Sequence, residues 1–228
     1  MAWFEQELGL PGFLAAAGAP VVPPSEEVGP EPVERRGLLV TFWKHVDHDP
    51  ARFDPEAAGR SLRALHRALA AYEEPLPSFD RLDEIDRLLR LLRPSTIASA
   101  DDLSALRRAW QRLEPPPPGG RRPLNGDSHF NNVLWTEEGP LWTDLENACE
   151  GPVEYDVACL LWRDAPGTNR AVAAYGRYDR EVAASVEPFL SLFLAVWTIA
   201  VIERVPSAGG RAELRRRIDR ATAAVRRG

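Results

Sequence analysis

A polar segment between short apolar runs constrains this chain more than any other feature. Residues Leu124 to Trp135 read Leu-Asn-Gly-Asp-Ser-His-Phe-Asn-Asn-Val-Leu-Trp. β-Prone residues flank the polar part at 122–125 and 132–136, and a further short run covers 141–144. The sequence therefore predicts a polar loop between short strands, followed by a hairpin with its turn at 137–139.

Such a hairpin would gather three polar side chains. Asp127 and Asn132 are five positions apart on the loop, and Asp144 ends the returning strand beside it. Carboxylate and amide oxygens are hard ligands that Mg²⁺ accepts together with nucleotide phosphates and water. A separate carboxylate can orient an acceptor hydroxyl and receive its proton. Asp and Asn also cap ordinary turns, but their combination with His129 and Asp144 favours magnesium-dependent phosphoryl transfer.

The segment resembles the aminoglycoside phosphotransferase and choline kinase family, which has the protein-kinase-like fold. The family pattern is His-Gly-Asp-x-His-x-x-Asn, then an Asp on the next strand, then Gly-Pro-x-x-x-Asp-x-Ala. Asn125 stands where the family usually has His. The matching residues are Gly126, Asp127, His129, Asn132, Asp144, Gly151, Pro152, Asp156 and Ala158.

The resemblance implies roles for these positions. Asp127 would be the catalytic base, and Asn132 and Asp144 would bind Mg²⁺, with ATP as the phosphoryl donor. His129 and Asp156 would brace the loop rather than react.

Four further residues carry weaker implications. Residues 40–46 resemble the family's hinge strand, so Phe42 and Trp43 are candidates for nucleotide contact, although a buried strand explains them equally well. Glu146 is a candidate supporting group on the metal side, and a surface carboxylate is an equal alternative. His66, on a segment resembling the first helix of the large lobe, is better interpreted as a packed core histidine.

Two parts of a kinase-like nucleotide site are not found in the sequence. No Gly-x-Gly occurs, and the single lysine, Lys44, aligns with the hinge rather than with the lysine that holds phosphates. Glu7 resembles the helix glutamate that would pair with that lysine. We therefore expect an α+β, protein-kinase-like fold. A truncated small N-terminal lobe would cover 1–48, and a mainly helical C-terminal lobe containing the catalytic hairpin would cover 49–228.

Hydrophobic periodicity and helix start signals complete the expected arrangement. A loop is expected over 25–36 and a strand over 37–45. Helices are predicted at 3–17, 55–73, 80–92, 101–113, 154–164, 180–204 and 209–226.

Composition narrows the class of partner. A net charge of −6 and a pI near 5.4 argue against nucleic acid, which requires a basic face. The cysteines, Cys149 and Cys159, form no disulfide framework and fit a reducing cytoplasm. The longest apolar stretch, 188–202, is shorter than the ~20 residues of a membrane span, so a buried core helix is expected.

The sequence thus favours a cytoplasmic kinase that phosphorylates a hydroxyl of a small molecule. One alternative is a truncated, catalytically impaired relative that only binds a ligand or partner. Another is a metal-dependent hydrolase, in which His129 would point at the metal. Either a monomer or a homodimer is compatible, since an exposed sheet edge would favour dimerisation.

Overall fold

The computed structural model describes residues 2–29, 31–79, 82–113, 120–162, 166–202 and 208–224. Two compact units share the chain. Unit 1 comprises residues 1–79 and 120–178, and unit 2 comprises 80–119 and 179–228. The predicted lobe boundary after residue 48 falls inside unit 1, and the division into lobes stays a prediction.

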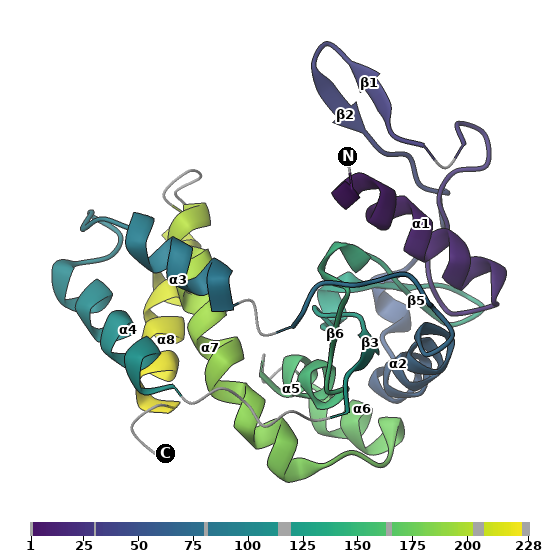
Figure 1. Cartoon of the computed structure of the whole chain (residues 1–228). Helices are drawn as coiled ribbons and strands as arrows, with labels where there is room; N and C mark the ends of the chain where they lie inside the picture. The colour runs from purple at the N-terminus through teal and green to yellow at the C-terminus, as the bar shows by residue number, and fades with distance from the viewer. Residues whose placement is uncertain are drawn as a thin grey trace. The chain divides into compact units, whose positions relative to one another are not determined.

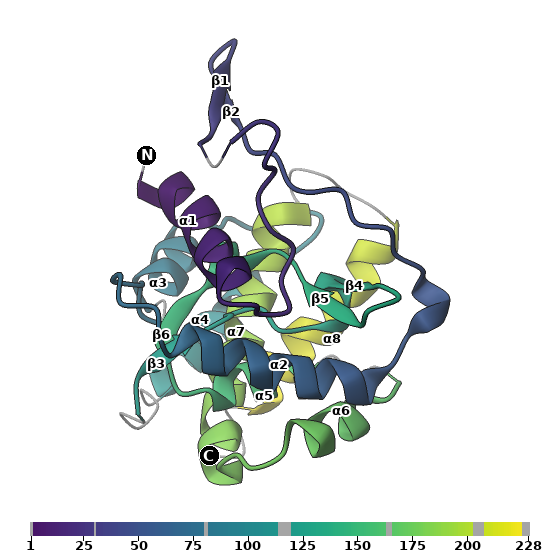
Figure 2. The same ribbon diagram turned by 90° about the vertical axis from the view of Figure 1, so that its right-hand side faces the viewer.

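Unit 1 combines four α-helices with three antiparallel pairs of short strands, β1–β2, β3–β6 and β4–β5, among its described residues (Figures 1 and 2). The expected α+β class is therefore confirmed. The elements are α1 (Ala2–Ala16), β1 (Val33–Arg35), β2 (Leu38–Val40), η1 (Pro50–Arg52), α2 (Pro55–Leu69), β3 (Arg122–Leu124), η2 (Phe130–Asn132), β4 (Val133–Trp135), β5 (Pro140–Trp142), η3 (Leu145–Asn147), β6 (Cys149–Gly151), α5 (Glu154–Trp162) and α6 (Thr168–Tyr175).

The core of unit 1 lies between α2 and the β4–β5 hairpin. Leu62, Leu65 and Leu69 follow one face of α2 and are fully buried, as the helical spacing predicts. Trp142 of β5 packs in the same cluster, and its indole nitrogen donates to Ser61 Oγ at 2.9 Å. Because the hairpin is fixed to α2 in this way, the loops at its ends have a rigid support.

Unit 2 consists of helices α3 (Leu82–Leu91), α4 (Ala100–Arg112), α7 (Arg180–Ile202) and α8 (Ala208–Ala224) in its described residues. Their inward faces form a separate apolar cluster that includes Leu103, Leu192 and Leu214. Helix α7 is long and apolar enough to cross a membrane by length and composition, a test that core helices also pass. Within the unit, α7 contributes fully buried residues to the core, as expected from its sequence.

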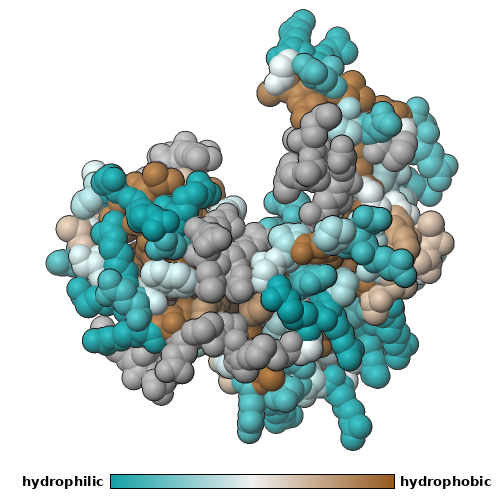
Figure 3. Space-filling view, viewed as in Figure 1, coloured by the Kyte–Doolittle hydropathy of each residue, from teal (hydrophilic) through white to brown (hydrophobic). Residues whose placement is uncertain are grey.

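The predicted helices are confirmed to within a few residues at their described ends, whereas the predicted ends at 80, 164, 204 and 226 lie outside the described residues. The strands predicted at 122–125, 132–136 and 141–144 are found as β3, β4 and β5, with the last ending two residues before Asp144. The N-terminal strands differ from the prediction. The segment predicted as a loop over 25–36 contains β1, and the strand predicted over 37–45 is limited to β2, with an isolated bridge between Pro24 and Trp43. Arg36 and Gly37 both adopt positive φ, 56° and 78°, which suits the tight turn of a hairpin. All six strand residues of this hairpin are exposed, so β1 has no pattern of buried residues that the sequence could reveal. In the space-filling view, both hydrophilic and hydrophobic residues lie on the surface of unit 1 (Figure 3).

Candidate active site

The polar loop after β3 is held close to its neighbours by a glycine. Gly126 adopts φ 82°, a conformation that side chains disfavour. A Cβ placed on Gly126 would lie 1.9 Å from the carbonyl oxygen of Asn147. Glycine at this position therefore allows the loop to lie against η3, next to Asp144.

Asp127 and Asn132 are in direct contact across the loop. The Asn132 side-chain nitrogen donates to the Asp127 backbone oxygen at 3.1 Å and to its carboxylate at 3.2 Å. His129 Nε2 lies 3.4 Å from Asp127 Oδ1. The Asp127 side chain is 30% exposed, so its carboxylate is oriented by the loop but remains accessible.

Asp144 returns to this loop through the β4–β5 hairpin. The register pairs Val133 with Trp142, and Thr143 N donates to the Asn132 carbonyl oxygen at 2.9 Å. The hairpin therefore brings Asp144 beside Asn132, as its length predicts. Asp144 itself adopts left-handed backbone angles, φ 60° and ψ 55°, which a non-glycine residue seldom adopts.

The electrostatics of Asp144 reflect its neighbours. The side chain is open to a pocket, yet burial by surrounding atoms is the main cause that raises the pKa of its carboxyl. The nearby charge of Asp127 raises this pKa further, and His129 opposes the rise. Two carboxylates that repel one another would be stabilised by a cation between them.

These residues fit a magnesium ion. Among the described residues no cluster of three or more His, Cys, Asp or Glu side chains suits a metal. Mg²⁺ does not require one, because it commonly binds one or two carboxylates and completes its shell with phosphates and water. Asp144 and the side-chain oxygen of Asn132 are ligands of this kind.

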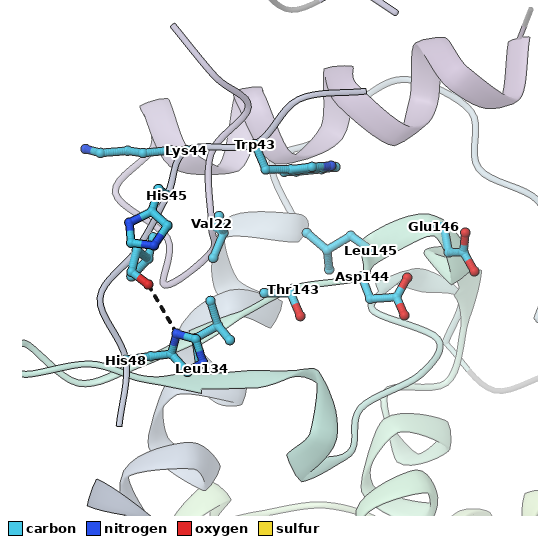
Figure 4. A pocket seen from close by; sticks show the side chains of 11 residues that line it. Val22, Trp43, Lys44, His45, His48, Leu134, Thr143, Asp144, Leu145 and Glu146 are labelled. Atoms are coloured by element: carbon cyan, nitrogen blue, oxygen red, sulfur yellow. Dashed lines mark hydrogen bonds between the residues drawn. The ribbon is translucent and has the colours of Figure 1, made fainter. Parts of the chain in front are cut away.

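A pocket of about 440 Å³ lies between Asp144 and the segment 43–46 (Figure 4). Trp43 lines it, whereas Phe42 does not. Figure 4 shows the end of the Lys44 side chain directed away from Asp144. The lining residues are Val22, Trp43, Lys44, His45, Val46, His48, Leu134, Thr143, Asp144, Leu145 and Glu146.

Backbone pairing fixes the pocket segment. Ser25 N donates to the Phe42 carbonyl oxygen at 2.9 Å, and Lys44 N donates to that of Pro23 at 3.1 Å. Trp43 is therefore held in an extended conformation at the pocket wall, and Glu146 on η3 lies at the same wall as Asp144 (Figure 4).

Asp156 lies at the start of α5 and is fully buried. Its carboxylate accepts hydrogen bonds from Asn125 N at 2.8 Å and Gly126 N at 2.9 Å. A third bond joins it to His66 Nε2 at 2.7 Å. Glu7 lies on α1, but its side chain is outside the described part of the structure.

Sequence reasoning missed two features of the site. The wall residues Val22, Leu134 and Thr143 carry no motif, and only the fold brings them together. Helix α6 was not predicted, so the hydrogen bond between its Tyr175 hydroxyl and His66 Nδ1, at 2.9 Å, had no signal.

Solved structures share this fold. An amicoumacin kinase in complex with AMP-PNP and Ca²⁺ matches with a TM-score of 0.70 and 12% identity, covering 97% of this chain and 77% of that one. A thermostable mutant of an aminoglycoside phosphotransferase matches with a TM-score of 0.71 and 16% identity, covering 99% and 84%. Choline kinase from Streptococcus pneumoniae gives a TM-score of 0.67 and 13% identity, covering 99% and 81%.

The architecture is thus protein-kinase-like, of the kind found in small-molecule kinases. More specifically, the model of the phosphotransferase enzyme family matches residues 4–189, and the chain belongs to that family of enzymes. No curated protein sequence matches the chain.

Proposed function

We propose that this chain transfers the γ-phosphoryl group of a nucleotide, with ATP as the donor, to a hydroxyl of a small molecule. The observation that carries this proposal is the pocket beside the polar loop. One wall holds Asp144, another holds Trp43, and the adjacent loop presents the accessible carboxylate of Asp127. Membership of the phosphotransferase enzyme family supports the reaction class.

Asp127 is the proposed base. Its backbone N–H donates to Asn125 Oδ1 at 3.1 Å, and its carboxylate accepts from the Asn132 amide, so the side chain has a defined orientation. An acceptor hydroxyl placed against this carboxylate would be oriented for attack and would lose its proton to it.

Asn132 and Asp144 are the proposed ligands of Mg²⁺. When bound, the ion would neutralise negative charge on the nucleotide phosphates. The amicoumacin kinase that shares the fold was solved with AMP-PNP and Ca²⁺, which supports a nucleotide and a divalent cation as partners of this site.

The pocket is the proposed nucleotide site. A volume of about 440 Å³ is within the usual range for ligand pockets. Trp43 offers an aromatic surface to a base, and the proposed metal ligand Asp144 lines the same pocket. Phe42 lies outside the lining, which weakens its candidacy.

The acceptor is proposed to be a small molecule with a hydroxyl group. Relatives in fold include kinases of amicoumacin and choline and an aminoglycoside phosphotransferase. The net charge of −6 of this chain suits a cationic acceptor of the same general kind.

The base assignment is tested by Asp127→Asn. The substitution keeps the shape but removes the proton acceptor, and transfer from γ-labelled ATP to a panel of aminoglycosides and amino alcohols should fall at least about 100-fold. Glu137→Gln, an exposed substitution at the hairpin turn, is the control and should leave transfer unchanged.

Activity of Asp127→Asn near the wild-type rate would refute the assignment. If the wild type binds Mg²⁺-nucleotide but transfers phosphate to no acceptor in the panel, the alternative of an impaired binding protein gains support.

A further inference from the structure

Three buried side chains connect two helices to the backbone of the loop that holds Asp127. Tyr175 on α6 contacts His66 on α2, and His66 contacts Asp156 at the start of α5. The exposed fractions of these residues are 5%, 8% and 0%. The connection is therefore shielded from water along its whole length, so its hydrogen bonds have no solvent substitute.

The direction of each hydrogen bond follows from Asp156. Its carboxylate already accepts two backbone N–H groups, and an ionised carboxylate can only accept. His66 must therefore donate from Nε2, and in the neutral imidazole Nδ1 then accepts the Tyr175 hydroxyl proton. Burial, with the charge of Asp156 as a further cause, raises the pKa of Tyr175 to about 12, so this phenol carries its proton at neutral pH.

We propose that His66 and Tyr175 are positioning residues for the phosphoryl transfer, acting through Asp156 on the backbone immediately before Asp127. This inference rests on the proposed function, because it takes Asp127 as the base. Neither residue lines the pocket, so the proposed effect is exerted through the loop.

The contacts explain why the loop would respond. Three consecutive backbone N–H groups are held by buried acceptors: those of Asn125 and Gly126 by Asp156, and that of Asp127 by the Asn125 side chain. His66 supplies the third hydrogen bond to Asp156 and so fixes the rotation of its carboxylate. A displaced carboxylate would shift the loop, and displacements near 1 Å can cost about 100-fold in rate.

The packing of α2 on α6 keeps His66 beside Tyr175. A Cβ on Gly59 of α2 would lie only 1.9 Å from the carbonyl oxygen of Ala171 on α6. The two helices therefore approach closely about two turns from His66 on α2 and one turn from Tyr175 on α6. The His66 and Tyr175 rings meet edge to face with centroids 5.5 Å apart.

A pair of His66 variants separates positioning from packing. His66→Leu fills the same space without a donor, whereas the amide nitrogen of His66→Gln can reach Asp156 as Nε2 does. We expect His66→Leu to lower kcat about tenfold or more with KM for nucleotide unchanged. We expect His66→Gln to restore most of the rate.

Hydrogen exchange of the backbone amides provides a measurement that does not depend on activity. The amides of 125–127 should exchange at least about tenfold faster in His66→Leu than in the wild type. The amides paired in the β4–β5 hairpin are the internal reference and should not change. Equal acceleration of both sets, or an unchanged kcat per folded molecule, would overturn the proposal.

Tyr175→Phe tests the outer member of the connection with little risk to folding, since only a hydroxyl is removed. It should lower kcat a few-fold in the wild type and have no effect in His66→Leu, because the two act in series. Additive effects in the double variant would contradict this order. If the wild type shows no phosphoryl transfer, the proposed function fails, while amide exchange at 125–127 still decides whether His66 and Tyr175 position the loop.

Discussion

At the scale of single residues, Asp144 combines two uncommon features. Asp144 adopts left-handed backbone angles, and its carboxylate lies within the field of Asp127. The repulsion between the two carboxylates is unfavourable in the protein alone, and such local costs are commonly found at functional sites. A cation bound between these carboxylates would offset their repulsion.

Asp144→Asn should therefore stabilise the metal-free protein at neutral pH. Because the pKa of Asp144 is raised on folding, the folded state binds this proton more tightly than the unfolded state. Folding is therefore favoured while the carboxyl is protonated. This stabilisation is lost as pH rises through the pKa of the folded state. Asn tolerates left-handed angles and removes the charge.

Urea unfolding in the presence of EDTA would measure this effect. We expect the free energy of unfolding of Asp144→Asn to exceed that of the wild type by less than about 1 kcal/mol at pH 7, because the wild-type carboxylate is open to solvent. The gain should vanish near pH 3, where the wild-type carboxyl is protonated as well. Glu137→Gln is the control, and a variant less stable than the wild type at pH 7 would contradict the expectation.

At the scale of elements, the helices and strands that can be predicted from the sequence are those with a clear local pattern of residues. The spacing of Leu62, Leu65 and Leu69 identifies α2, and the polar segment after β3 identifies the loop and hairpin. Helix α6 has only eight residues and begins directly after Gly167, so its periodicity is too short to recognise. Strand β6 reads Cys-Glu-Gly and is a strand only because β3 pairs with it.

The residues that support the loop were harder to predict because they have no local pattern. The polar residues of the loop lie within a few positions of one another, but His66 and Tyr175 are 109 positions apart. Nothing local to either residue predicts that contact, which depends on the close packing of α2 and α6.

The close packing of α2 and α6 predicts that a glycine-to-alanine substitution has opposite effects on stability at Gly59 and Gly9. Gly59→Ala should destabilise the protein by about 2 kcal/mol or more, since its Cβ would overlap the backbone of α6. Gly9→Ala in α1 should stabilise it by about 0.5–1 kcal/mol, because no atom lies within 4 Å of the added Cβ and alanine favours helix. Denaturant unfolding of the two variants measures both, and equal effects would contradict the close approach.

At the scale of the whole molecule, the two units have separate cores. Leu62 is fully buried in the cluster of unit 1 and Leu192 in that of unit 2, and the two clusters share no residue. The chain passes from one unit to the other at residues 79–80, 119–120 and 178–179.

Cavities in the two cores should therefore have local effects. Leu62→Ala and Leu192→Ala should each lower the free energy of unfolding of the affected unit by about 2–5 kcal/mol. Hydrogen exchange should accelerate in α1, α2 and α6 for the first and in α3, α4, α7 and α8 for the second. Uniform acceleration across all helices in both variants would show that the cores unfold together.

The interleaved path also determines when the chain can fold during synthesis. Helix α2 leaves the ribosome long before α6, its partner across Gly59 and His66. At about 5–20 residues per second, the 109 positions between His66 and Tyr175 correspond to roughly 5–20 s. Throughout that interval the leucines of α2 have no helix α6 beside them, so the nascent chain exposes apolar surface that the finished protein buries.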